Sequence, residues 1–391
     1  MNFILFDGPE RNNLLPFTYT RPVAEIRVGI LSLREKWEKH LNASTTTETQ
    51  DYLSEKFPIT TLDKNIKINP VYLPTENLAG IVKNLQENQA LFDDDRPIAY
   101  FFIDNQKVNF DDFEVIQYTH NDVLKISNTW DIFRLNGEAI QRDFELLTQG
   151  RKSQPIPDSV FCIHKENIFL EEGAKVELAS LNASAGPIYI GKDAEVMEAC
   201  AIRGPFALCD HSTLKMGAKI YGPTTVGPHC KVGGEVNNSV FFGYSNKAHD
   251  GFLGNSVIGE WCNLGADTNN SNLKNNYAEV RLWNYESENF ARTGLQFCGL
   301  MMGDHSKCGI NTMFNTGTVV GVSANIFGSG FPRNFIPSFS WGGAAGMTTF
   351  KTDKAFEVAR EVMKRRDLEF NQVEEKILEH VFEITAKYRR S

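Results

Sequence analysis

A run of aliphatic residues in the middle of this chain recurs at a strict interval of six. Neither an α-helix, with 3.6 residues per turn, nor an extended strand, with a period of two, keeps that interval on one face. A hexapeptide repeat does, because each flat side of a parallel β-helix presents one aliphatic residue to the core. The interval therefore predicts stacked coils, about 4.8 Å apart and joined by backbone hydrogen bonds. The eight residues are Ile190, Val196, Ile202, Leu208, Leu214, Ile220, Val226 and Val232.

Two interruptions divide the repeat beyond these residues. Between residues 238 and 251 the interval loosens, and we expect a loop to leave the coil there. The interval returns at Ile258 and Leu264, and a stretch rich in asparagine and charge at residues 267–295 interrupts it again. Because it then resumes, we expect the β-helix to extend over residues 156–350. The later positions are Cys308, Phe314, Val320 and Ile326.

The segments on either side of the repeat have other patterns. Apolar runs at residues 3–6 and 98–103 are typical of buried strands, whereas residues 22–41 and 130–147 have apolar residues near helical spacing. We therefore expect residues 1–155 to form an α/β domain.

The last segment, residues 351–391, has apolar residues near helical spacing, with charged residues on the other face. This pattern predicts an amphipathic helix or helix pair that caps the open end of the β-helix. The expected fold class is thus α/β plus all-β.

Composition and charge argue against several classes of function. The formal net charge of −9 gives no basis for electrostatic binding to nucleic acid or to an anionic membrane. Seven cysteines without a Cys-x-x-Cys pair argue against a disulfide framework and a thiolate zinc site. The apolar start spans four residues, and no apolar run reaches the ~18 residues of a membrane helix. We therefore expect a cytoplasmic protein with reduced cysteines.

A short motif follows the first predicted strand. The ten residues from Asn13 to Pro22 read Asn-Leu-Leu-Pro-Phe-Thr-Tyr-Thr-Arg-Pro. They resemble the stretch Arg-Leu-x-Pro-Leu-Thr-x-x-x-Pro-Lys of sugar-1-phosphate nucleotidyltransferases, which implies a Rossmann-like nucleotidyltransferase domain. In that family a glycine-rich loop, the arginine and the lysine hold the nucleoside triphosphate. Here the loop is reduced to Asp-Gly-Pro-Glu-Arg at residues 7–11, and Asn13 and Val23 take the arginine and lysine positions.

The resemblance implies binding of a nucleoside triphosphate, UTP by analogy, together with Mg²⁺. Phosphoryl chemistry depends on positive charge at the phosphates, and Arg11, Arg21 and Arg27 are candidates to replace the missing cations. Asp104, at the end of an apolar strand, corresponds to a Mg²⁺ ligand of the family. An aspartate at such a place also caps helices and forms turns. A degenerate nucleotidyltransferase fold, kept for structure, remains the alternative.

A second set of motifs lies where the repeat is interrupted. In chain order the motifs are Glu235, Asn237, Lys-Ala-His at 247–249, Phe-Leu-Gly at 252–254, Ile-Gly at 258–259, Asn-Leu-Gly-Ala at 263–266, and Asn272. This set resembles the acetyltransferase domain of the bifunctional enzyme that makes UDP-N-acetylglucosamine, whose pattern can be laid on this stretch without a gap. The match covers about 40 residues.

This second resemblance implies a role for each matching residue. His249 is the general base, and Glu235 orients it or binds the amino sugar. Phe252, which replaces a tyrosine of the family, and Asn263 line the sugar pocket. Acetyl-CoA is expected to contact Ala266, Asn272 and Leu273. Asn237 stands at a sugar-binding lysine of the family, and Tyr221 aligns near an arginine that holds the sugar phosphate, with Lys219 as the replacement cation.

The residue types suit acetyl transfer to an amino sugar. An amino sugar is an ammonium ion at neutral pH and loses a proton before its nitrogen attacks a thioester. Histidine, with a pKa near ~6.5, is the side chain best matched to accept that proton.

Taken together, the chain resembles a divergent, bifunctional UDP-N-acetylglucosamine pyrophosphorylase/glucosamine-1-phosphate N-acetyltransferase. The resemblance implies acetylation of glucosamine-1-phosphate or a related amino-sugar phosphate, with uridylyl transfer in the N-terminal domain. A triangular β-helix has flat sides that pack against other copies, so we expect a homotrimer.

Two other functions stay open. The first is a non-catalytic assembly or regulatory protein with a degenerate nucleotidyltransferase domain. The second is a zinc enzyme of the γ-carbonic anhydrase type, which would use His211, His229 and His305, although no two histidines have a close ligand spacing.

Overall fold

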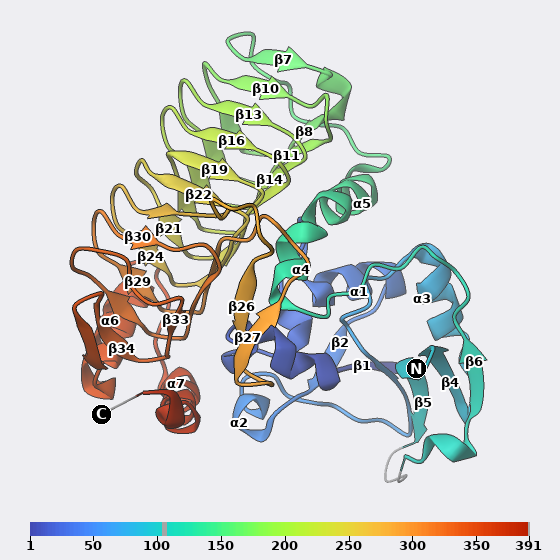
Figure 1. Cartoon of the computed structure of the whole chain (residues 1–391). Helices are drawn as coiled ribbons and strands as arrows, with labels where there is room; N and C mark the ends of the chain where they lie inside the picture. The colour runs from blue at the N-terminus through green and yellow to red at the C-terminus, as the bar shows by residue number, and fades with distance from the viewer. Residues whose placement is uncertain (104–107, 390–391) are drawn as a thin grey trace. The chain divides into compact units, whose positions relative to one another are not determined.

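The computed structural model describes residues 1–103 and 108–389, and its chain divides into two compact units (Figure 1). The first unit contains residues 1–14, 20–26 and 31–128. The second unit contains the rest, including two short N-terminal segments at residues 15–19 and 27–30.

The first unit is built on a mixed six-stranded sheet in the order β2-β1-β3-β5-β4-β6. β1 is parallel to both of its neighbours, and β5 is antiparallel to β3 and β4. The predicted α/β class is therefore confirmed. The strands are β1 (Asn2–Phe6), β2 (Thr45–Glu48), β3 (Lys64–Ile68), β4 (Gln89–Asp93), β5 (Arg96–Ile103) and β6 (Glu114–Gln117), and the helices are α1 (Leu33–Leu41), α2 (Asp51–Ser54) and α3 (Glu76–Lys83).

The helix expected over residues 22–41 is shorter than its apolar spacing suggested. It begins only at Leu33, where a capping box fixes its start. The Ser32 hydroxyl accepts from the Glu35 N–H, and the Glu35 carboxylate accepts from the Ser32 N–H at 2.6 Å. These two bonds satisfy main-chain donors that the first helical turn leaves unpaired.

The helix expected over residues 130–147 is a pair, α4 (Thr129–Arg134) and α5 (Asn136–Thr148), in the second unit. Two buried side chains of α5 hold the segment at residues 27–30. Asn136 Oδ1 accepts from the Gly29 N–H, and Asp143 Oδ2 accepts from the Ile30 N–H, both at 2.7 Å. This segment is thus fixed by polar contacts within the second unit.

Three parallel sheets form the sides of the predicted left-handed β-helix, which the structure confirms. We call them the first, second and third sheets. The first contains β7 (Phe161–Ile163), β10 (Ser180–Asn182), β13 (Ala201–Arg203), β16 (Lys219–Tyr221), β19 (Glu235–Asn237) and β22 (Phe252–Gly254). The second contains β8 (Ile168–Leu170), β11 (Ile188–Ile190), β14 (Phe206–Leu208), β17 (Thr224–Val226), β20 (Val240–Gly243), β23 (Val257–Glu260), β28 (Leu300–Met302), β31 (Thr318–Val320) and β33 (Phe335–Ile336). The third contains β9 (Lys175–Val176), β12 (Glu195–Val196), β15 (Thr213–Leu214), β18 (Lys231–Val232), β21 (Asn246–Lys247), β24 (Asn263–Leu264), β29 (Lys307–Cys308), β32 (Asn325–Ile326), β34 (Ser340–Gly343) and the antiparallel β35 (Gly346–Thr349).

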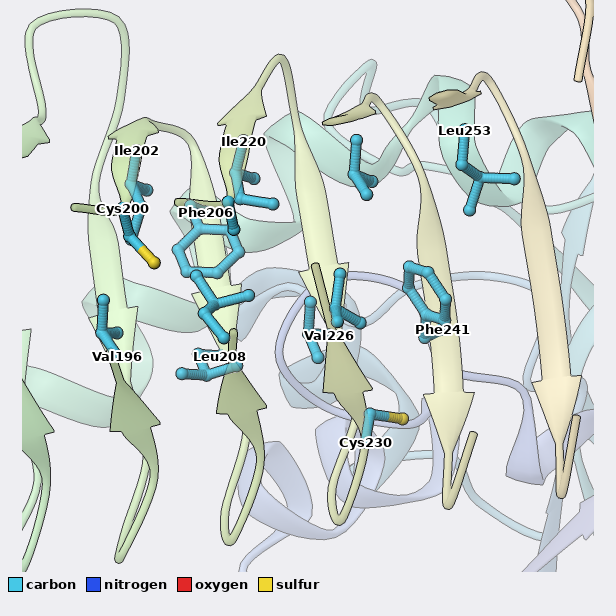
Figure 2. Close-up of a cluster of buried hydrophobic side chains, with 14 of the residues drawn as sticks. Val196, Cys200, Ile202, Phe206, Leu208, Ile220, Val226, Cys230, Phe241 and Leu253 are labelled. Carbon is cyan, nitrogen blue, oxygen red and sulfur yellow. The ribbon is translucent and has the colours of Figure 1, made fainter. Parts of the chain in front are cut away.

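The eight residues of the six-residue interval all point into the core, and each is at most 2% exposed. Equivalent residues are paired from coil to coil, as Ile202 is with Ile220 and Leu208 is with Val226. Figure 2 shows this alignment for Ile202 and Ile220 and for Leu208 and Val226. The six-residue interval in the sequence is therefore the separation between core residues on successive sides of the β-helix.

The first interruption is not a loop, contrary to our expectation. Paired residues are normally 18 positions apart, as are Leu208 and Val226, but Val226 pairs with Phe241, 15 positions on. The coil continues without leaving the β-helix, and its corners are shorter. The corner between β18 and β19 is two residues shorter than a full-length corner, because Val236 follows Val232 by four positions instead of six.

The second interruption lies where the sequence placed it, and the structure shows it to be an excursion from the β-helix. Leu264 pairs with Cys308, and the segment between them carries the antiparallel hairpin β26 (Arg281–Asn284) and β27 (Asn289–Arg292). β25 (Asn269–Asn270) and β30 (Met313–Phe314) pair with each other on either side of the excursion.

One corner of the β-helix carries a stack of rings, which we call the ring ladder. All its members have a left-handed backbone, with φ between 53° and 61°. Centroids of neighbouring rings lie 4.4 to 6.2 Å apart. The members are His211, His229, Tyr244, Trp261 and His305.

The chain ends in the helix pair α6 (Thr352–Lys364) and α7 (Gln372–Ile384), as expected. Within the described ranges, no helix combines the length and the hydropathy needed to cross a bilayer.

Candidate functional site

Five of the residues expected in the sugar site lie together on the outward face of the first sheet. Lys219, Glu235 and Phe252 are paired across β16, β19 and β22, so their side chains form one column. Tyr221 and Asn237 are paired in the neighbouring column. The stacking of coils therefore brings together residues that are up to 33 positions apart in the chain.

Glu235 is the centre of this group. Its Oε1 accepts from the Tyr221 hydroxyl at 2.6 Å, and its Oε2 lies 3.8 Å from the Lys219 ammonium. The hydrogen bond to the carboxylate raises the pKa of Tyr221 to about 12, with burial adding to the effect. The Tyr221 hydroxyl therefore stays protonated at neutral pH, and one oxygen of Glu235 is held in place by it.

His249 lies on the corner that leads into β22, and we call residues 248–251 the His249 corner. The Gly251 carbonyl accepts from the Glu235 N–H at 3.2 Å, so this corner stacks directly against Glu235. The His249 side chain is exposed and makes no hydrogen bond or ion pair with another residue of the described ranges. An imidazole in this state is available to an external ligand.

The shortened corner explains why His249 is exposed. In the coil before it, only Gly233 and Gly234 separate the strand residue Val232 from Glu235, and neither glycine has a side chain to cover the imidazole. A Cβ atom on Gly234 would lie 2.8 Å from the His249 carbonyl oxygen. The glycines therefore permit a close approach of the two corners.

The residues expected to contact acetyl-CoA lie in the next coil. Ala266 is at the position equivalent to His249, because the Asp267 N–H donates to the Asp250 carbonyl at 2.9 Å. Asn263 is exposed on the third sheet, just before this corner. Asn272 lies beyond the far end of β22 with Leu273, and its Nδ2 donates to Asn255 Oδ1 at 2.8 Å. The structure thus places Ala266, but not Asn272, at the His249 corner.

In the first unit, Arg11 is held inside the protein. It is 9% exposed, its Nε lies 3.3 Å from Asp7 Oδ2, and its Nη2 donates to the Tyr52 hydroxyl at 2.9 Å. Asp7 also accepts from the Val23 N–H at 2.7 Å and from the Thr49 hydroxyl at 2.6 Å. A carboxylate of the chain therefore neutralises this cation.

The other nucleotide candidates are also engaged or lie elsewhere. Arg21 is 4% exposed. Arg27 belongs to the second unit, where it donates to the carbonyls of Phe242 and Ile30. Asp104 lies outside the described residues.

A charged network at the carboxyl edge of β1 and β3 was not found from the sequence. Glu10 is 1% exposed and accepts from Arg96 Nη1 at 2.8 Å and from Asn69 Nδ2 at 3.3 Å, with Lys125 Nζ at 3.6 Å. A Cβ atom on Gly8 would lie 2.7 Å from Asn69 Nδ2, so only glycine fits there. In open α/β sheets this edge is where ligands bind, and here side chains fill it.

No group of three or more His, Cys, Asp or Glu side chains arranged to hold a metal ion occurs in the described part of the chain. Of the three histidines considered for zinc, His211 and His229 stack on each other in the ring ladder at 4.9 Å between centroids. His305 stacks on Trp261 further along the same ladder.

Comparison with known families gives one match. Residues 3–152 match the family model described as sugar nucleotidyl transferase. No curated protein matches the chain.

Three solved structures similar to this chain are described as acyltransferases. The Arabidopsis UDP-N-acetylglucosamine acyltransferase is 14% identical, with 60% of this chain and 94% of that chain covered and a TM-score of 0.25. The UDP-N-acetylglucosamine acyltransferase of Campylobacter jejuni is 13% identical, with 59% and 96% covered and a TM-score of 0.25. A variant of AntD, an N-acyltransferase from Bacillus cereus in complex with dTDP and coenzyme A, is 11% identical, with 53% and 91% covered and a TM-score of 0.23. TM-scores this low support no argument about function.

The close approach at Gly234 gives a test of the site geometry. Gly234→Ala introduces a Cβ atom at a φ of +74°, against the His249 carbonyl. Gly217→Ala is the matched control, because Gly217 has a φ of +72° and nothing within 4 Å of its Cβ position. We expect the control to lose about 1 kcal/mol of stability from the left-handed backbone, and Gly234→Ala to lose at least twice as much.

The measurement is thermal unfolding of both variants, with hydrogen exchange of the peptide at residues 247–252. Faster exchange of that peptide in Gly234→Ala alone is the expected result. Equal stability and equal exchange in the two variants would show that the corners do not pack as described.

Proposed function

We propose that the β-helix transfers an acetyl group from acetyl-CoA to the amino group of an amino-sugar phosphate, with glucosamine-1-phosphate as the first candidate. The observation that carries this proposal is the arrangement at the His249 corner. An exposed histidine with no internal partner stands beside a column of a carboxylate, a cation and an aromatic ring. These groups match a sugar that carries an amine and a phosphate.

In the proposed reaction, His249 removes a proton from the substrate ammonium group. The freed amine attacks the thioester carbonyl carbon, a C–N bond forms, and the C–S bond breaks with release of the CoA thiol. The nitrogen gives up its second proton after the attack, the leaving thiolate takes up one proton, and the other returns from His249 to solvent. A positioned histidine of this kind contributes about 10²- to 10⁴-fold to the rate.

The outward column orients the substrate in this proposal. Lys219 is 61% exposed and supplies positive charge for the sugar phosphate, while Phe252 and Asn263 contact the sugar ring. Glu235 and Asn237 bind hydroxyl or amino groups, and the Tyr221 hydroxyl fixes one oxygen of Glu235.

Acetyl-CoA, the second substrate, enters beside Ala266. The methyl side chain of Ala266 is half-buried at the position next to His249, so it leaves room for the thioester. Asn272 and Leu273 contact the remainder of the substrate in this proposal, at the other end of β22.

The histidine is tested by replacing it. We expect His249→Ala to lower the rate of CoA release from acetyl-CoA and glucosamine-1-phosphate by at least about 10²-fold, because no other group then accepts the proton. His164→Ala is the control, since His164 is also an exposed histidine of the β-helix and its Nδ1 lies 3.0 Å from Glu166 Oε1. The control is expected to keep the wild-type rate.

The rate is followed with a thiol reagent and repeated with other amino sugars and their phosphates. Absence of CoA release from the wild-type protein with every amino sugar would sink the acetyltransferase proposal.

For the N-terminal domain we propose a non-catalytic role, in place of uridylyl transfer. Two observations favour this: Asp7 neutralises Arg11, and Glu10 neutralises Arg96. Family members need free cations for the triphosphate. Asp7 and Glu10 are also committed to internal donors, so the described residues do not fit a Mg²⁺ site and we derive no step through the metal.

A non-catalytic role predicts that the N-terminal domain catalyses no uridylyl transfer. With UTP, N-acetylglucosamine-1-phosphate and Mg²⁺, we expect no pyrophosphate above the background of a heat-treated sample. Asp7→Asn removes the carboxylate from Arg11 and is expected to remain inactive, because Asn13 and Val23 stay at the family's cation positions. Pyrophosphate release that depends on the wild-type protein would overturn the non-catalytic role.

We further propose that the protein is a homotrimer formed through the outward face of the first sheet. Large apolar side chains are exposed there and on the corner that leads from the third sheet into the first, with Phe161 65%, Leu178 63% and Met216 69% exposed. Burying them against two further copies removes apolar surface from water.

The trimer is tested by measuring mass in solution. We expect three times the chain mass of 44.0 kDa for the wild type and a smaller species for Phe161→Asp. Tyr277→Asp, at a 65% exposed tyrosine of the excursion and outside the three sheets, is expected to leave the mass unchanged. A monomeric wild-type protein would contradict this assembly.

A further inference from the structure

A lysine occupies a core position that the six-residue interval otherwise gives to aliphatic residues. Lys247 pairs with Val232 of the preceding coil and is in line with Leu264 of the next one. Its side chain points inward and is 1% exposed. The mechanism proposed above does not use this ammonium group.

The ammonium group replaces main-chain donors that the shortened corner lacks. In full-length corners, the first carbonyl after the strand accepts from an N–H three residues on. Ala218 donates to Lys215 in this way at 3.2 Å, and Thr268 donates to Gly265 at 3.3 Å. The corner at Gly233 is two residues too short for that turn.

Lys247 supplies the missing donor from inside the β-helix. Its Nζ donates to the Gly233 carbonyl at 3.1 Å and to the His249 carbonyl at 2.8 Å. These two hydrogen bonds therefore join the shortened corner to the His249 corner, at Gly233 and His249.

Burial at this position is unfavourable for the charged form of the lysine side chain. Burial lowers the pKa of Lys247 to about 8, against the opposing effect of Asp250, Asp267 and Cys308. None of the carboxylates in the described ranges lies within 4 Å of Nζ. A buried cation without a carboxylate is less favourable for stability than an apolar side chain. We therefore attribute the presence of Lys247 to the main-chain geometry that its two hydrogen bonds fix.

We propose that Lys247 is a positioning residue for His249. Its two hydrogen bonds fix the main chain from which the imidazole extends. This inference rests on the proposed role of His249 as the general base.

The experiment compares Lys247→Met with Lys307→Met. Lys307 is a matched control, because its Nζ also donates to two corner carbonyls, those of Trp261 and His305, and burial lowers its pKa to about 8 as well. We expect Lys247→Met to lower kcat for CoA release at least about tenfold while KM for acetyl-CoA stays within about twofold. The control is expected to keep kcat within about twofold.

A second measurement does not depend on activity. Hydrogen exchange of the peptide at residues 247–252 reports how firmly the His249 corner is held. Loss of the two hydrogen bonds from Nζ is expected to make this peptide exchange at least about tenfold faster in Lys247→Met. The peptide that contains His164 is expected to exchange at the same rate in the variant and the wild type.

Lys247→Gln serves if the methionine variant does not fold, because it keeps an amide donor without the charge. It is expected to show faster exchange in the same peptide, because the shorter side chain does not reach both carbonyls. Unchanged exchange together with an unchanged kcat would overturn the proposal, and so would loss of folding in both variants, since Lys247 would then be a structural residue. If the wild-type protein releases no CoA, the proposed function fails, while the exchange of this peptide still decides whether Lys247 holds the His249 corner.

Discussion

Backbone hydrogen bonds between successive coils determine where every side chain of the β-helix lies. Each joins equivalent positions, as when the Gly191 N–H donates to the Leu208 carbonyl at 2.7 Å and the Cys209 N–H donates to the Val226 carbonyl at 2.8 Å. A sequence interval thereby becomes a column in space. The aliphatic core, the ring ladder and the column that contains Glu235 are three outcomes of this one constraint.

The fold was predictable because the core of a β-helix is periodic in sequence. The same reasoning failed at residues 238–251, where a shorter coil was read as a departing loop. Counting residues does not distinguish a shortened coil from a departing loop, because a coil is shortened only where a corner can close with fewer residues. Two features of the sequence indicated a shortened coil. Gly233 and Gly234 permit a tight corner, and Lys247 lies six positions before the core residue Leu253, so the interval continues through it.

The first unit was less predictable, because its contacts join distant residues. The capping box at Ser32 and Glu35 is a local signal that would have corrected the start of α1. By contrast, the pairing of Glu10 with Arg96 depends on which strands are neighbours in the sheet. The two units also use charge differently. Carboxylates neutralise cations inside the first unit, whereas Lys219, Glu235 and His249 of the second unit are at least partly open to solvent.

The excursion between Leu264 and Cys308 has a consequence for how the length of such a chain can change. These residues pair across 44 positions, yet the strands on both sides keep their register. Loop-closure entropy grows only with the logarithm of loop length, so extending such an excursion costs about 0.6 kcal/mol for each doubling. The chain of the excursion can therefore change in length while the stacked coils, and the histidine that they carry, keep their register. The residues of β26 are less free to change, because Leu282 is fully buried and Trp283 stacks on Phe335 at 4.2 Å between ring centroids.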